Sequence, residues 1–222
     1  NLTEDCSYSL RFIHDTLHPY GFTEAWAYRD GLTSQWHGMS SQRVSELFER
    51  ALCVINLCGS SHPETLTYRP KGTLLYLETD PVLYQVRLAQ GDAAALQFLG
   101  GHDAHATYGE NLGEPDCPIP LTHFNWKKTR PPVVLDLWPV REGDARQRFT
   151  TIATWHNRGK DLCFARETYH WSKHLNFLSV AALPRRVEQD LELGVEIDDQ
   201  EALHTFRQNG WILTDPLAVS QD

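Results

Sequence analysis

The sequence predicts an α/β protein made of two Rossmann-like units with parallel sheets, and both units are expected to be incomplete. Short apolar runs alternate with amphipathic stretches of helical period, as in sheets whose parallel strands are joined by crossover helices. Residues 73–87 show this order best, because an apolar run, a polar turn and a helical pattern follow one another directly. A polar stretch interrupts the alternation at 139–147. We therefore predict a first unit over 1–138, a linker over 139–147 and the start of a second unit over 148–222.

The chain is predicted to open with a helix, a short strand and a second helix. Residues 4–17 carry apolar side chains at helical spacing on one face. A short strand is expected at 24–28. Ser40 or Ser41 is suited to cap the next helix, which extends to Arg50, because a serine hydroxyl accepts a hydrogen bond from the first helical turn.

Two short apolar runs, 53–57 and 73–77, predict two strands of a parallel sheet. The second run is continuous, which is typical of a strand buried on both faces. Thr79 or Asp80 is expected to cap the helix that follows, with Pro81 in its first turn, where a missing N–H group costs nothing.

The rest of the first unit is predicted to contain one further helix and further extended segments. A helix at 92–99 ends at a pair of glycines. A strand is expected at 105–108, a short extended piece at 117–120, a basic and proline-rich stretch at 126–132, and another strand at 133–138.

The second unit repeats the alternation of strands and helices. Strands are predicted at 149–154, 191–197 and 211–214, and helices at 171–183 and 199–208.

Composition excludes several classes of function. The 222 residues carry a net charge of −9, whereas a nucleic-acid-binding protein normally presents a basic surface. No apolar run approaches the roughly 20 residues that a membrane span requires. The five cysteines show neither zinc-ribbon spacing nor a disulfide framework, so a reducing cytoplasm is the expected location.

Polar side chains follow two of the predicted strands. Glu78, Thr79 and Asp80 come after one strand, and Glu110 and Asn111 after another. Ligands of parallel sheets bind beyond the carboxyl ends of the strands. The carboxylates there can hold a sugar hydroxyl or act as a general base. The alternative is that these residues only form turns and caps.

A second group of candidates lies at 102–105. His102 and Asp103, together with Glu110, provide the side chains of a small hydrolase, if the fold brings them within hydrogen-bond reach. The three-residue spacing of His102 and His105 does not favour a metal pair, and no metal is expected. Because no dinucleotide or P-loop glycine pattern is present, no cofactor is expected either.

In the second unit, cations and an aromatic side chain are candidates for ligand contacts. Arg158 follows the first strand and Lys173 stands at the start of the next helix, and both can bind a phosphate group. Tyr169 can stack on a base or a sugar. The alternatives are solvated surface cations and packing between a helix and the sheet.

Beyond these local patterns, the order of elements resembles a two-domain glycosyltransferase of the GT-B type. More narrowly, the chain resembles a group of bacterial glycosyltransferase-like proteins. The stretches that carry the resemblance are EDCSYSLRFI (4–13), YLETDPVLYQVRLAQGD (76–92), HDAHATYGENLGEPDCPIP (102–120), TRPPVVLDLWP (129–139), RFTTIATW (148–155) and YHWSKHLNFL (169–178).

The resemblance implies a function and a division of labour. The first unit would hold the acceptor and the second a nucleotide-sugar, with Lys173 or Arg158 near the donor diphosphate. The opening glycine-rich loop and the acidic donor segment of such enzymes are missing, so the chain is expected to be a central piece that is inactive alone. The full-length parent would transfer a sugar from a nucleotide-sugar. The alternative is a non-catalytic α/β protein that binds a ligand or a partner.

Overall fold

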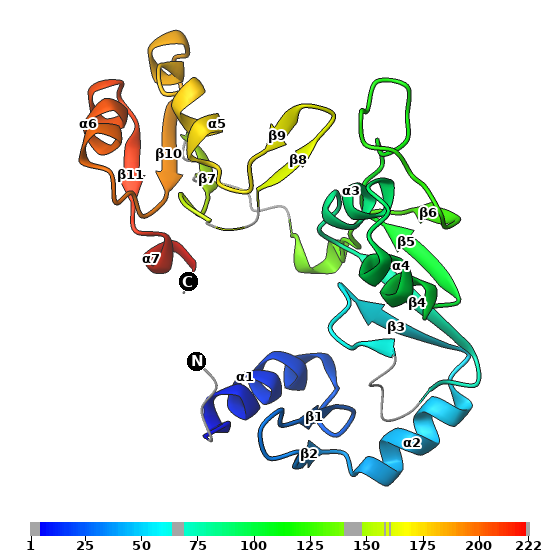
Figure 1. Cartoon of the computed structure of the whole chain (residues 1–222). Coiled ribbons are helices and arrows are strands. Elements are labelled where there is room, and N and C mark those ends of the chain that lie inside the picture. Colours follow the sequence, from blue (N-terminus) through cyan, green and yellow to red (C-terminus); the bar gives the residue numbers. More distant parts are fainter. Residues whose placement is uncertain (1–4, 64–68, 140–147, 158, 160, 221–222) are drawn as a thin grey trace. The chain divides into compact units, whose positions relative to one another are not determined.

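The structure is a computed structural model, and it describes residues 5–63, 69–139, 148–157, 159 and 161–220. The chain divides into two compact units, Asn1–Pro131 and Pro132–Asp222 (Figure 1). The division falls at Pro131, whereas the sequence places it after Trp138. Residues 140–147, most of the predicted linker, lie outside the described residues.

Unit 1 begins with helices and a small antiparallel pair of strands. In chain order these are α1 (Ser7–Leu17), η1 (His18–Tyr20), β1 (Ala27–Arg29), β2 (Trp36–Gly38) and α2 (Ser41–Arg50). The two predicted helices are confirmed. Ser40 caps α2, since its Oγ accepts a hydrogen bond from the Arg43 N–H at 3.2 Å. Strand β2 was not predicted, because its three residues are too few for an alternating pattern.

The centre of unit 1 is a sheet of four parallel strands in the order β3-β4-β5-β6. They are β3 (Cys53–Leu57), β4 (Thr73–Glu78), β5 (Ala104–Thr107) and β6 (Trp126–Lys128). One face packs through Tyr76 and Trp126 against Leu88 and Leu99 of the helices α3 (Leu83–Ala89) and α4 (Ala93–Gly100).

Two expectations about this sheet need correction. Strand β4 is not buried on both faces, because Leu75 and Leu77 on the face opposite Tyr76 are only half-buried. Strand β6 lies in the stretch that the sequence analysis describes only as basic and proline-rich. Its two lysines are exposed and only Trp126 is buried, so the sequence shows no apolar pattern that would predict a strand there.

The start of α3 also differs from the prediction. The helix begins at Leu83, so neither Thr79 nor Asp80 caps it, and Pro81 precedes it. Instead, Gln85 Oε1 accepts a hydrogen bond from the Val82 N–H at 2.7 Å. Val82 itself has a φ of +96°, which is rare for a β-branched residue.

The predicted helix after residue 92 is confirmed. Asp92 precedes α4 and its Oδ1 accepts a hydrogen bond from the Ala95 N–H at 3.0 Å, as a side-chain cap does.

Unit 2 contains a second parallel sheet, in the order β11-β10-β7. Its elements are η3 (Leu135–Leu137), β7 (Arg148–Ile152), β8 (Leu162–Phe164), β9 (Glu167–Tyr169), α5 (His174–Ser179), η4 (Leu183–Arg186), β10 (Asp190–Gly194), α6 (Gln200–Gln208), β11 (Ile212–Thr214) and α7 (Pro216–Ser220). Its core gathers around Trp155, Leu193, Phe206 and Trp211 and shares no residue with the core of unit 1. The protein is therefore an α/β protein with two parallel sheets flanked by helices.

Three predictions for unit 2 were wrong in part. The expected strand at 133–138 is a short 3₁₀ helix, η3, whose side chains are exposed, Leu135 by 77% and Trp138 by 74%. The expected helix at 171–183 is shorter and is followed by η4. The antiparallel pair β8–β9 was not predicted, because its turn at Ala165 and Arg166 has positive φ at both residues without a glycine.

Candidate functional site

A cavity in unit 2 lies at the carboxyl ends of all three strands of its sheet. It has a volume of about 700 Å³, within the range of small-molecule sites. Thr154 and His156 follow β7, Glu196 and Asp198 follow β10, and Pro216 follows β11. Because the strands are parallel, all their carboxyl ends meet at one edge, where a ligand is expected to bind.

The wall of this cavity carries charges of both signs. Lys173 contributes a cation from the residue before α5. His156 Nε2 lies 3.6 Å from Asp198 Oδ1. Glu196 adds a second exposed carboxylate. The site can therefore meet an anionic group and a group with several hydroxyls at the same time.

Hydrogen bonds hold the loop after β7 against the segment before α5. Ser172 Oγ accepts a hydrogen bond from the Asn157 N–H at 2.8 Å and donates one to the Asn157 carbonyl at 3.1 Å. The His174 N–H donates to the Trp155 carbonyl at 3.2 Å. These bonds fix the backbone on both sides of His156 and Lys173.

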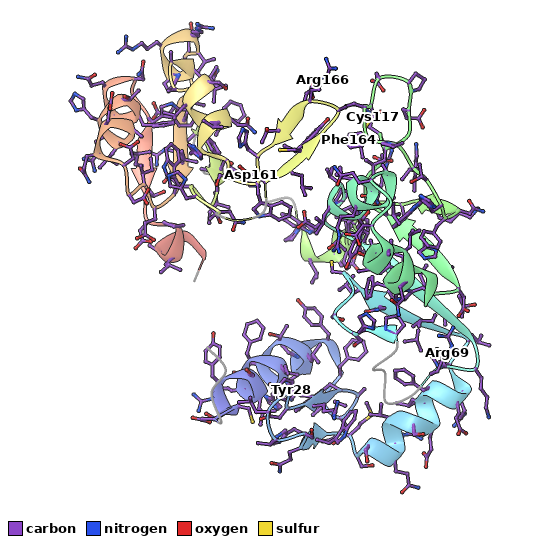
Figure 2. The ribbon with its side chains drawn as sticks, in the orientation of Figure 1. Tyr28, Arg69, Cys117, Asp161, Phe164 and Arg166 are labelled. Atoms are coloured by element: carbon purple, nitrogen blue, oxygen red, sulfur yellow. The ribbon has the colours of Figure 1, made fainter. Side chains whose placement is uncertain are left out.

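Asp161 forms a second connection between these segments. Its carboxylate accepts a hydrogen bond from the Trp171 N–H at 2.9 Å and lies 2.8 Å from His170 Nδ1. The bond from Trp171, followed by that from His170, lowers the pKa of Asp161. Asp161 lies at the base of the β8–β9 hairpin, and Arg166 lies at its tip (Figure 2).

Trp155 both lines the cavity and belongs to the hydrophobic core of unit 2. Trp155 is 3% exposed and packs edge-on against Phe206, with ring centroids 5.6 Å apart. The rings of His156 and His174 lie 4.3 Å apart. Trp155 Nε1 and His174 Nδ1 are buried, and neither has a hydrogen-bond partner among the described residues.

Of the predicted residues of unit 2, Lys173 lines the cavity. Tyr169 lies in β9, and its hydroxyl donates to Glu167 Oε2 at 3.4 Å. Arg158 lies outside the described residues.

Sequence reasoning missed Glu196 and Asp198. The predicted strand at 191–197 ran through the first of them, whereas β10 ends at Gly194. The rule that ligands bind beyond strand ends would have found Glu196 if the end of this strand had been placed correctly, and it already applied to Asp198, which directly follows the predicted strand.

In unit 1, Glu78 faces the interior and is 2% exposed. Its Oε2 accepts hydrogen bonds from Gln85 Nε2 at 2.7 Å and from Thr107 Oγ1 at 2.8 Å. Its Oε1 is buried without a partner among the described residues. Burial outweighs the two hydrogen bonds and raises the pKa of Glu78 to about 7.

Thr79, Asp80, Glu110 and Asn111 lie beyond the carboxyl ends of β4 and β5, as the sequence predicts. Thr79 Oγ1 lies 2.5 Å from the Sγ of Cys58. Glu110 Oε1 accepts a hydrogen bond from Arg130 Nε at 2.6 Å, so this carboxylate is already paired. Asp80 and Asn111 are exposed.

His102 and Asp103 lie at the opposite end of the sheet. Asp103 Oδ2 accepts a hydrogen bond from the Leu74 N–H at 2.7 Å, where β4 begins. Asn56 Nδ2 donates to His102 Nε2 at 2.8 Å in the interior. The four residues of β5 lie between these two residues and Glu110. At about 3.3 Å per residue, the strand alone separates them by roughly 13 Å. The structure does not bring together the three side chains that the hydrolase hypothesis requires.

Within the described ranges, no group of three or more His, Cys, Asp or Glu side chains could hold a metal ion. In the same part of the chain, no helix is both long and apolar enough to cross a membrane. Comparison of the sequence and structure with protein-family models, curated proteins and solved structures found no match.

Proposed function

We propose that the chain belongs to a nucleotide-sugar-dependent glycosyltransferase of the GT-B type, and that the cavity of unit 2 binds the nucleoside diphosphate of the donor. The observation that carries the proposal is that Lys173, Glu196 and Asp198 line one cavity at the carboxyl edge of a parallel sheet. The sequence resemblance to GT-B glycosyltransferases also assigns the nucleotide-sugar to unit 2.

The chemistry of the cavity suits such a ligand. A lysine ammonium pairs with a diphosphate, because each phosphate offers several charged acceptor oxygens. The carboxylates of Glu196 and Asp198 accept hydrogen bonds from ribose hydroxyls. Lys173 and the two carboxylates come from different segments, so they can contact separate parts of one extended ligand.

For unit 1 we propose the acceptor side. Asp80 and Asn111 are exposed beyond the carboxyl ends of β4 and β5 and can hold sugar hydroxyls. Glu78 is excluded from direct contact with an acceptor in this structure, because its carboxyl group is buried.

The donor part of the proposal is tested by titrating the full chain with UDP-glucose and GDP-mannose in a calorimeter. We expect binding of at least one donor, and we expect Lys173→Ala to weaken it about tenfold, because a charge-assisted contact is lost. The matched control is Lys127→Ala on β6, an exposed lysine of unit 1, which should leave the affinity unchanged. Absence of heat with every donor up to millimolar concentration would contradict the proposal.

A second candidate function is ligand binding without catalysis. It is favoured because two carboxylates of unit 1 are not free to act as a general base. Glu78 is buried, and Glu110 is paired with Arg130. Donor binding without any sugar transfer or donor hydrolysis by the full-length parent would support this candidate over the transferase.

A further inference from the structure

Strand β3 lies at one edge of the parallel sheet of unit 1, with β4 on its other side. Just before and just after β3, Leu52 accepts and Cys58 donates a backbone hydrogen bond to β4, at 3.0 and 2.8 Å. Because backbone groups alternate in direction along a strand, those of Cys53, Ile55 and Leu57 point away from β4. Of these outward groups, only the Leu57 carbonyl has a hydrogen-bond partner among the described residues, in the turn that follows.

The outward edge of β3 also carries exposed apolar side chains. Ile55 is 55% exposed and Leu57 is 51% exposed. They lie on the face opposite Tyr76, next to the half-buried Leu75 and Leu77 of β4. Backbone groups that seek partners and an apolar strip therefore occur together at this edge.

The other edge strands of the two parallel sheets are shorter or charged. Strands β6 and β11 have three residues each, and β6 exposes Lys127 and Lys128. Strand β7 has five residues but begins with Arg148. Short length and charge are the usual means that keep an edge from pairing. Strand β3 has neither, since its five residues, CVINL, include no charge and no proline.

We propose that β3 pairs with β3 of a second copy of the chain, antiparallel and about a twofold axis at Ile55. Ile55 then lies opposite Ile55 of the partner subunit, and Cys53 lies opposite Leu57 of the partner subunit, so that all the outward residues face one another. The pairing joins two four-stranded sheets into one sheet of eight strands.

Two features favour a second copy as the occupant of this edge. An uncharged strand can pair with itself, because no like charges come to lie opposite one another. The joined sheet then ends on both sides at β6, whose exposed lysines oppose the addition of further strands. The assembly thus closes at the dimer.

Sedimentation of the full chain at concentrations from about 1 to about 200 µM tests the pairing. One pair of strands buries less surface than a standard interface of about 1,600 Å², so we expect a dissociation constant in the micromolar range. Ile55→Lys should raise this constant about tenfold or more, because it removes an apolar pair and places two ammonium groups opposite each other. The matched control is Phe149→Lys on the edge strand β7, where Phe149 is 67% exposed, and it should leave the dimer unchanged.

Hydrogen exchange followed by mass spectrometry locates the interface in the unmodified chain. We expect peptides that cover 53–57 to exchange more slowly at the high concentration than at the low one, because the outward N–H groups are bonded only in the dimer. Ile55→Pro removes an N–H group that β3 does not use toward β4, so it should abolish both the dimer and this protection.

Three results would overturn the pairing: a monomer at every concentration, a dimer that survives in Ile55→Lys, or exchange at 53–57 that is independent of concentration in the unmodified chain. The last measurement decides the question even if a variant fails to fold. None of these results affects donor binding in unit 2, which is measured separately.

Discussion

Glu78 shows how a single carboxyl group can link the turns at the end of a sheet. Through Gln85 it is connected to the backbone at Val82, and through Thr107 to the N–H of Gly109 at 3.1 Å. Both bridging side chains donate to the same oxygen, Oε2. A protonated carboxyl group leaves the unpartnered Oε1 less costly to bury than a carboxylate does.

Stability should therefore depend on the protonation of Glu78. Its pKa is raised from 4.5 to about 7 in the folded state. The folded state thus binds more protons than the unfolded state between these values, and stability is lost as the pH rises through 7. We expect this residue to lower the free energy of unfolding by about 3 kcal/mol between pH 4.5 and pH 8.

Urea unfolding of wild type and Glu78→Gln at pH 5, 6, 7 and 8 measures this effect. The difference between the two proteins isolates Glu78 from His102 and His105, whose pKa values are lowered by burial and whose contribution is lost as the pH falls. Glu24→Gln, at an exposed position, is the control. Equal pH slopes in wild type and Glu78→Gln would rule out the role of Glu78.

At the scale of elements, the cap of α2 offers a direct measurement. Ser40 Oγ accepts a hydrogen bond from the Arg43 N–H at 3.2 Å. We expect Ser40→Ala to lower the free energy of unfolding by about 1 kcal/mol, because the N–H then loses its partner in the protein. Ser45→Ala, within the same helix, is the comparison. A loss no greater than that of Ser45→Ala would show that the cap does not stabilise the helix.

Strands with short apolar runs could be predicted from the sequence. Strands β3 and β4 are examples, and both form where the sequence places them. Strand β6 could not be recognised, because its lysines Lys127 and Lys128 are exposed and Trp126 is its only apolar residue. The prediction of a strand at 133–138 was wrong for the opposite reason. Its apolar composition is typical of a strand, but the structure leaves these side chains exposed.

The candidate site was only partly predictable, because the positions of some of its side chains depend on contacts between distant segments. Lys173 was identified by its place beside a strand–helix junction. Asp198 was not, although it directly follows the predicted strand, because its proximity to His156 depends on the fold. The burial of Glu78 was also hidden, since the direction of a side chain at a strand end depends on the register of the sheet.

At the scale of the whole molecule, the two hydrophobic cores are separate. We expect Phe206→Ala to destabilise unit 2 by about 3–5 kcal/mol, because Phe206 is fully buried in its core. Hydrogen exchange followed by mass spectrometry should then show faster exchange in β10 and α6, with β4 as protected as in wild type. Equal loss of protection in β4 would show that the two units unfold together.

The order of strands in the two sheets has a consequence for synthesis on the ribosome. In unit 1, spatial order follows chain order from β3 to β6. In unit 2, the sheet order β7-β10-β11 also follows chain order, with the β8–β9 hairpin between the first two strands. Each newly translated strand of these sheets can therefore join the free edge of a sheet that is already growing. Unit 1 can complete its sheet while unit 2 is still being made, so the nascent chain exposes one unfinished core at a time.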